Sequence, residues 1–145
     1  MIIRPLSSAD AAAVAALSDH LGYPVPPGEM ATRLAALLAC PDHALFGAED
    51  EAGELAGWVH ICARLLLIDP PSAFVEGVVV SPGVRRRGVG RALMAAAEEW
   101  ARGRGLGVVR LRSAATRGEA HAFYRALGYG EGKAALGFEK PPGAG

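Results

Sequence analysis

The sequence predicts one α/β domain in which helices cover a mixed β-sheet. Two observations carry this prediction: β-type runs alternate with helical patterns along the chain, and 51% of the 145 residues are hydrophobic while 21% are charged. A strand, a helix and a second strand between residues 75 and 113 should place two parallel strands side by side at the centre of the sheet. We expect the domain to span residues 1–140, followed by a disordered tail over residues 141–145.

Two helices follow a short first strand. Ser7 and Asp10 have the spacing of a helix-capping pair before an alanine-rich segment, and Gly22 is the expected end of that helix. Closely spaced prolines then predict a loop, because proline has a fixed φ and no backbone donor. Pro41 should stop the second helix. The expected elements are a strand over residues 2–6, a helix over about 8–21, a loop over 23–28 and a helix over about 30–40.

The central part of the chain favours β-structure. Two runs, residues 43–49 and 54–68, flank the turn at residues 50–53 and predict a hairpin. The next run, residues 73–81, is almost entirely apolar at its end, as in a strand that is covered on both faces. It is therefore the strand that we expect at the centre of the sheet.

The C-terminal part is expected to alternate again between helix and strand. Its first helix should bury one apolar stripe, formed by Val89, Leu93, Ala96 and Trp100. Gly128 is the expected stop of its second helix. The expected elements are a helix over residues 88–102, a strand over 107–113, a helix over 119–127 and one or two short strands over 129–140.

Composition excludes several classes of protein. The formal net charge is zero, which disfavours a general nucleic-acid binder, and no apolar run approaches the roughly 18 residues of a membrane span. The first ten residues have no export signal, and Cys40 and Cys62 have neither metal-type nor redox spacing. We expect a cytoplasmic protein without a membrane or nucleic-acid partner.

Positive charge is concentrated in one segment. Ten arginines, three glutamates and no lysine lie between Arg85 and Arg125, which gives this segment a charge of +7 and the remainder −7. A solvated helix surface would explain part of this excess. Arginine without lysine favours an anionic ligand, because the planar guanidinium matches phosphate better than an ammonium does.

The turn "RRRGVGRAL", residues 85–93, has four interpretations. A Walker-type phosphate loop fails, because Gly90 is followed by Arg91 and Ala92 instead of Lys and a hydroxyl residue. A dinucleotide fingerprint is weak, because Leu93 stands where a third small residue belongs. A purely structural turn stays open. The fourth is an anion site, in which glycine amides and unpaired N–H groups of a helix start bind a diphosphate among arginines, without a metal.

Residues 78–94, "VVVSPGVRRRGVGRALM", resemble the acetyl-CoA signature of the GNAT superfamily of N-acetyltransferases. In that signature Arg or Gln, two residues, Gly, one residue and Gly or Ala follow a central strand, and Arg85, Gly88 and Gly90 match this spacing. A second family motif is similar to "RGEAHAFYRALGY", with one departure: Arg117 stands where the family often has Asn. The matching residues of the second motif are Ala120, Phe123, Tyr124, Gly128 and Tyr129.

The resemblance implies a GNAT-like fold with a mixed, largely antiparallel sheet, splayed parallel strands 4 and 5, and helices on both faces. It also implies acetyl-CoA as the cofactor and direct attack of an amine on the thioester in a ternary complex. The amide of Val78 would stabilise the thioester oxygen, Val80 would hold pantetheine, and Tyr124 would protonate the departing thiolate. The residues implied to bind the cofactor are Val78, Val79, Val80, Arg85, Arg86, Arg87, Gly88, Val89, Gly90, Arg91 and Tyr124.

A general base matters more than an acid if the acceptor is an alkyl amine. Releasing the free base of an amine of pKa about 10.4 at pH 7 costs about 4.6 kcal/mol. Glu76 lies two residues before Val78 on an apolar strand, so strict alternation gives both side chains the same face. We expect Glu76 to act as the base through a water. A wetted strand end, or a pair with an arginine, is the alternative role for this carboxylate.

The predicted function is transfer of an acetyl group from acetyl-CoA to a primary amine of a small molecule. Acetylation of a protein N-terminus or lysine, a non-catalytic acyl-CoA-binding regulator and a nucleic-acid-binding module are the alternatives. Acceptor contacts are expected in the tail strands and in the loop "HLGYPVPPGE", at His20, Tyr23 and Glu29. Homodimers are common in the family, but no apolar stripe here requires one.

Overall fold

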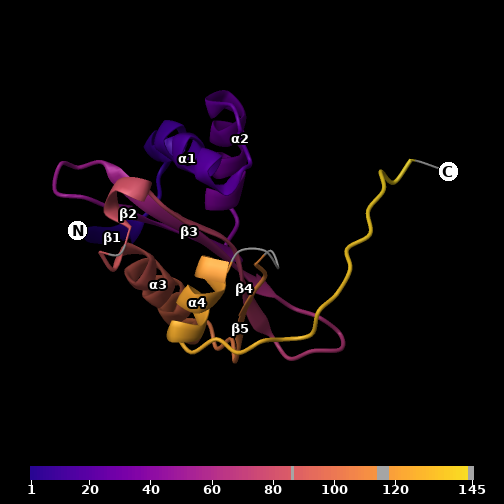
Figure 1. Cartoon of the computed structure of the whole chain (residues 1–145). Helices are drawn as coiled ribbons and strands as arrows, with labels where there is room; N and C mark the ends of the chain where they lie inside the picture. Colours follow the sequence, from indigo (N-terminus) through magenta and orange to yellow (C-terminus); the bar gives the residue numbers. More distant parts are fainter. Residues whose placement is uncertain (86, 114–117, 144–145) are drawn as a thin grey trace. The chain divides into compact units, whose positions relative to one another are not determined.

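The computed structural model describes residues 1–85, 87–113 and 118–143, and its contacts divide the chain into two units, Met1–Arg112 and Ser113–Gly145. The described residues of the first unit form a five-stranded sheet (Figure 1). Neighbouring strands are antiparallel except for the last pair, which is parallel, as the sequence predicted. In sheet order the strands are β1 (Ile2–Pro5), β2 (His43–Glu49), β3 (Leu55–Arg64), β4 (Ser72–Val80) and β5 (Val109–Leu111).

Helix α3 (Val89–Gly103) packs on one face of the sheet. Val59 and Ile61 of β3 are 0% exposed on this face, and so is Leu93 of α3. A Cβ built on Gly57, which shares this face, would lie 3.1 Å from Leu93 Cδ1. The buried stripe of α3 includes Val89 and Leu93 as predicted, but it does not continue through Ala96 and Trp100. The alanines of this helix lie on several faces, so the sequence did not show in which direction the stripe runs. The buried side chains of α3 are Val89, Leu93, Met94, Ala97 and Ala101.

Helices α1 (Ala11–Ser18) and α2 (Pro27–Leu38) lie on the opposite side of the sheet (Figure 1). Their apolar residues pack with Trp58, whose side chain alternates with that of Val59 and so faces away from α3. The buried members of this second core are Leu6, Ala11, Val14, Leu34 and Leu45.

The predicted start of the first helix is confirmed, with one added turn. The Ser7 N–H donates to Asp10 Oδ2 at 2.8 Å, and a 3-10 turn, η1 (Ser8–Asp10), precedes α1. A second 3-10 turn, η2 (Asp19–Leu21), ends at Gly22, whose φ of 80° suits glycine. Helix α2 begins at Pro27, so the predicted loop ends two residues early; proline is tolerated there because the first helical turn has no acceptor for its missing N–H.

Two predicted strand regions are wrong. β3 ends at Arg64, opposite Ser72, and residues 65–68 are exposed outside the sheet. Pro70 and Pro71 explain this end, because proline cannot donate to a ladder across from those residues. Residues 129–140 hold neither helix nor strand; this glycine-containing segment has no β-branched residue to favour a strand.

The second unit contains α4 (Gly118–Ala126), which ends before Gly128 with a φ of 96°, as predicted. Both cysteines are free. In the described ranges no helix combines the length and hydrophobicity needed to cross a bilayer. The domain over residues 1–140 and the disordered tail over 141–145 stay predictions, and residues 144–145 lie outside the described part of the chain.

Candidate functional site

A glycine turn joins the sheet to α3 in the first unit. After β4 the chain passes through a short turn, η3 (Pro82–Val84), and extended Arg85, and it reaches Gly88 in a left-handed conformation with φ of 80°. Any residue with a Cβ is strained at this φ, although the space around Gly88 is open. The glycine is therefore needed for the backbone path that starts the helix.

The first amides of α3 form a donor-rich surface. The first intrahelical bond is from the Ala92 N–H to the Gly88 carbonyl at 3.0 Å, so the N–H groups of Val89, Gly90 and Arg91 precede it. The first turn contains no acidic residue, and Gly88 provides no side-chain cap. Free amides at the positive end of the helix dipole favour an anion, so this turn has the chemistry of a phosphate site.

The arginines of the basic segment fall into two groups. Arg85, Arg87 and Arg91, around the glycine turn, are exposed and have neither hydrogen bonds nor ion pairs with other described residues. Farther along, Arg102 pairs with Glu99, Arg104 with Asp42 at 2.9 Å and Arg110 with Asp69 at 3.9 Å. In the second unit Arg125 pairs with Glu131 at 2.6 Å. Arg112 likewise has no ion pair with another described residue, and its guanidinium lies 5.6 Å from the centre of the Phe74 ring. The turn is therefore where unmatched positive charge gathers among the described arginines of this segment, while Arg86 and Arg117 lie outside the described residues.

Within the described ranges, no strand pairs with one edge of β4 at its C-terminal end. β5 pairs with β4 only from Ala73 to Val75, and β4 continues to Val80. The Ser81 N–H donates to the Ala56 carbonyl across the β3 edge at 2.8 Å. Because backbone groups alternate along an antiparallel pair, Val79 also faces β3, whereas Val78 and Val80 face the edge that β5 has left.

The expected alternation from Glu76 to Val78 is wrong. The register of β3 and β4 shifts between His60 and Ile61, where Glu76 is the extra residue of a β-bulge. Val78 lies opposite Val59 and therefore faces α3. The Glu76 side chain instead contacts residues of β3 on the α1 and α2 side. Gly77 was the available signal, because a glycine inside a strand often marks a bulge.

Glu76 pairs with an arginine, the alternative role that the sequence left open. Arg64 Nη2 donates to Glu76 Oε1 at 2.8 Å, and Cys62 Sγ lies 3.4 Å from the same oxygen. The Glu76 side chain is 34% exposed, so water reaches the carboxylate. Burial raises the pKa of the Cys62 thiol and the Glu76 charge adds to this rise, which keeps the thiol protonated as a donor.

A histidine pair beside Glu76 was missed by the sequence analysis. His43 Nδ1 lies 2.8 Å from His60 Nε2, and both side chains are half-buried. His60 shares a face with Trp58 and Cys62, and its partner on β4 is Gly77, next to the bulge. Burial lowers the pKa of His60 and His43 lowers it further, whereas Glu76 acts in the opposite direction. Alternation along residues 58–62 could have placed His60 on this face of the sheet. It could not have predicted that His43, on a different strand, contacts His60.

Tyr124 belongs to the second unit. It lies on α4, in edge-to-face contact with Phe123 and Tyr129 at centroid distances of 5.2 and 6.2 Å. Its carbonyl accepts the N–H groups of Leu127 and Tyr129 at the helix end. The aromatic motif therefore organises the end of α4, and the proposed acid role of the phenol stays a prediction.

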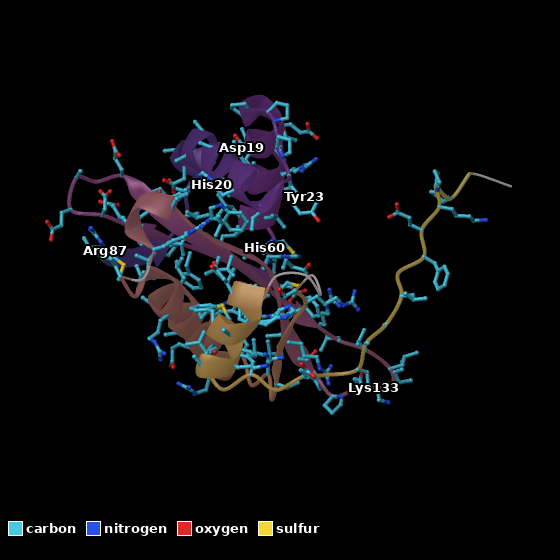
Figure 2. The ribbon with its side chains drawn as sticks, viewed as in Figure 1. Asp19, His20, Tyr23, His60, Arg87 and Lys133 are labelled. Atoms are coloured by element: carbon cyan, nitrogen blue, oxygen red, sulfur yellow. The ribbon has the colours of Figure 1, made fainter. Side chains whose placement is uncertain are left out.

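The expected acceptor residues lie around the end of α1 and the start of α2. Figure 2 shows His20 and Tyr23 near Asp19, on the same side of the sheet as His60. Tyr23 is 73% exposed, and Glu29 is paired with Arg33 at 2.6 Å. A hollow of about 430 Å³ beside α1 is lined in part by His20, and no predicted cofactor residue lines it. The tail strands that were expected to contact the acceptor are absent from the described residues.

Comparison with known proteins gives consistent results. The model of the acetyltransferase (GNAT) family matches residues 12–129. Aminoglycoside N(6')-acetyltransferases type 1 from Stenotrophomonas maltophilia and Klebsiella aerogenes are 34% and 31% identical, over 96% and 97% of this chain and 92% and 96% of their own lengths. The solved aminoglycoside antibiotic 6'-N-acetyltransferase from Acinetobacter haemolyticus matches with a TM-score of 0.85 and 25% identity, over 97% of this chain and 99% of that one.

Proposed function

The chain belongs to the acetyltransferase (GNAT) family, and from this premise we propose that its acceptor is the 6'-amine of an aminoglycoside. The chain is an acetyl-CoA-dependent N-acetyltransferase that acetylates a primary amine of a small molecule. The observation that carries the aminoglycoside proposal is the nearly full-length match to two aminoglycoside N(6')-acetyltransferases. This match favours a small-molecule acceptor over a protein N-terminus, a lysine side chain or a regulatory role without catalysis.

Charge on the acceptor side supports a cationic substrate. Asp19 lies beside the exposed Tyr23 at the end of α1 (Figure 2), and Glu76 lies on the same side of the sheet. Aminoglycosides carry several ammonium groups, which carboxylates bind through charge-assisted hydrogen bonds. On the α3 face Val59, Ile61 and Leu93 have no exposure, so we propose that the amine approaches the end of β4 from the α1 and α2 side, where Glu76 is 34% exposed.

The cofactor residues fit acetyl-CoA by their backbone chemistry. We propose that the outward amides of Val78 and Val80 bond to the acetyl and pantetheine part, which supplies the missing partners of that strand edge. The diphosphate would be bound by the amides at the start of α3, together with the arginines around the turn. The residues proposed for this second part are Arg85, Arg86, Arg87, Gly88, Val89, Gly90 and Arg91.

Acetyl-CoA supplies an activated acetyl group, but the chain has to assist the two proton transfers that accompany acetylation. The acceptor ammonium must lose a proton; the sequence predicted Glu76 as the base, whereas its ion pair with Arg64 favours binding of the ammonium by this carboxylate. The thiolate that leaves must gain a proton, for which Tyr124 is the proposed donor. We propose that the amine attacks directly in a ternary complex, with no acyl-enzyme. A cytoplasmic location is supported by the use of acetyl-CoA, and a homodimer stays a prediction.

The decisive experiment compares two aminoglycosides that differ only in a 6'-amino or a 6'-hydroxyl group. Release of the CoA thiol is followed with each, and with a lysine peptide, an N-terminal peptide and a linear polyamine. We expect rapid thiol release only with the 6'-amino compound, because a hydroxyl is a much poorer nucleophile at neutral pH. Equal rates with both aminoglycosides, or turnover with a peptide alone, would contradict the proposed acceptor.

A further inference from the structure

The polar groups next to the β4 bulge offer two separate roles in deprotonation of the acceptor, one that binds the ammonium and one that takes its proton. We infer that the His43–His60 pair accepts the proton of the acceptor ammonium through a water, while Glu76 binds the cationic amine beside it. This inference rests on the proposed function only in requiring a protonated alkyl amine as the acceptor. It assigns a catalytic role to His60 and a positioning role to His43.

The first argument is that Glu76 already has partners. Its Oε1 accepts Arg64 Nη2 at 2.8 Å and lies 3.4 Å from Cys62 Sγ. The other oxygen stays available to hold an ammonium, and carboxylates do so well in a partly exposed position. Removing a proton would instead require this carboxylate to become neutral beside a guanidinium, which sacrifices the ion pair. Its geometry therefore favours binding of the cation.

The second argument is the geometry of the histidine pair. A separation of 2.8 Å between His43 Nδ1 and His60 Nε2 is a hydrogen bond in which one nitrogen donates to the other. That bond leaves His60 Nδ1 and His43 Nε2 as the two outer nitrogens. A zinc ion would hold two imidazole nitrogens farther apart than this, since each Zn–N bond is about 2.0 Å long. The described residues contain no group of three metal ligands that includes the pair.

The third argument is position. His60 is the cross-strand partner of Gly77, which precedes Val78, whose amide faces the open edge of β4. On the opposite face the neighbouring side chains of Val59 and Ile61 have no exposure. His60 is half-buried on the same face as the Cys62 and Arg64 side chains that contact Glu76, where a water can connect it to a nitrogen held at Glu76.

The proton transfers balance as follows. The acceptor ammonium loses one proton to His60 Nδ1 through the water, and His60 then releases this proton from Nδ1 to solvent while the hydrogen bond to His43 holds its ring in place. The free amine then forms the C–N bond while the C–S bond breaks. The second proton lost by the nitrogen replaces the acetyl group on the sulfur. One proton is released for each amide formed, and the pair keeps its number of protons.

The groups that face His60 set the pH dependence of this step. Burial and the neighbouring His43 lower the pKa of His60, so the ring is neutral and able to accept a proton at pH 7. Glu76 raises the same pKa, and Arg64 and Cys62 bind that carboxylate. Loss of His43 should therefore raise the pKa of His60, and loss of the Glu76 charge should lower it.

The test is the pH profile of kcat/KM with the accepted amine, for the wild type and four variants. We expect His60→Gln to lower kcat/KM at pH 7 by about 100-fold or more and to abolish the acid limb, as for a general base. His43→Gln should move the acid limb to higher pH, and Glu76→Gln should move it to lower pH and raise KM. Glu51→Gln, in the exposed turn after β2, is the control for a lost carboxylate and should leave the profile unchanged.

Folding is separated from chemistry by two further measurements. Each variant is required to bind coenzyme A with unchanged affinity, and His60→Ala should regain at least tenfold activity in added imidazole. A His60→Gln variant that binds coenzyme A and retains its rate and acid limb would overturn the inference, as would a Glu76→Gln variant that loses the limb. If aminoglycosides are not acetylated, the same profiles with another accepted amine still decide it.

Discussion

Two groups of arginines in the first unit show how the same residue type serves the fold in one place and a ligand in another. Arg4 donates to both carboxylate oxygens of Asp10 at 2.9 Å and to Glu49 at 2.6 Å. Arg85 and Arg91, at the glycine turn, have no acceptor among the described residues. Charge that the chain matches itself stabilises the fold, whereas charge left unmatched at a helix start is available to an anion.

The difference has an energetic side. Arginines near the positive end of a helix dipole repel it and one another, so the turn around Gly88 is less stable without a ligand than with one. The Arg4 cluster has the opposite character, because Asp10 is only 8% exposed and also accepts the Ser7 N–H. Natural sequences depart from favourable local electrostatics mainly where function requires it.

Reversing the unmatched charges should have the largest effect. We expect Arg85→Glu with Arg91→Glu to weaken acetyl-CoA binding at least 100-fold, because each charge-assisted hydrogen bond contributes about 1.5 to 3 kcal/mol. Titration calorimetry with coenzyme A measures this change. Arg102→Glu is the matched control on the same helix, since its exposed pair with Glu99 faces solvent, and it should change the affinity less than threefold. Equal losses of coenzyme A affinity in the two variants would show that the arginines at the turn and the paired arginines do not differ in cofactor binding.

Removing a charge from the cluster of Arg4, Asp10 and Glu49 should lower the stability of the fold and leave the affinity for the cofactor unchanged. Asp10→Asn leaves Arg4 without its main partner, and we expect a loss of about 2 to 3 kcal/mol in the free energy of unfolding. Arg4 holds the pKa of Asp10 below its usual range, so this stabilisation is present above about pH 4 and disappears as the pH falls through the folded-state pKa.

Urea unfolding of the wild type and Asp10→Asn at pH 7 and at pH 3 checks both parts. The difference between the two proteins should shrink at the lower pH, because the Asp10 carboxyl of the unfolded wild-type chain is then largely protonated, so the stabilisation from the folded ion pair is partly lost. A constant difference would mean that the Asp10 charge has no role, and that the loss comes from the helix cap alone.

The smallest predicted effect concerns the turn itself. Gly88→Ala forces a Cβ into a left-handed conformation, and we expect it to cost about 1 kcal/mol of stability. Gly83→Ala is the matched control, since Gly83 is equally open but has no positive φ. Thermal unfolding of both should show a lower Tm only for the first. An equal shift would show that the left-handed Gly88 is not what starts α3.

The sequence by itself determined the order of the elements as far as α4, the glycine turn and the family. Gly88, Gly90 and Arg85 carry that information locally, because a left-handed residue and a helix start depend on a few neighbouring residues. The wrong strands at 65–68 and 129–140 are also local errors, which the adjacent prolines and the absence of β-branched residues could have corrected.

Tertiary structure alone decided which charges are matched and which side chains meet. The bulge at Glu76 depends on how β3 and β4 align, and it moves that carboxylate to the face opposite Val78. His43 and His60 lie 17 residues apart and meet only through the register of β2 and β3. Periodicity along one strand predicts a face, but the partner on that face is set by the pairing of distant strands.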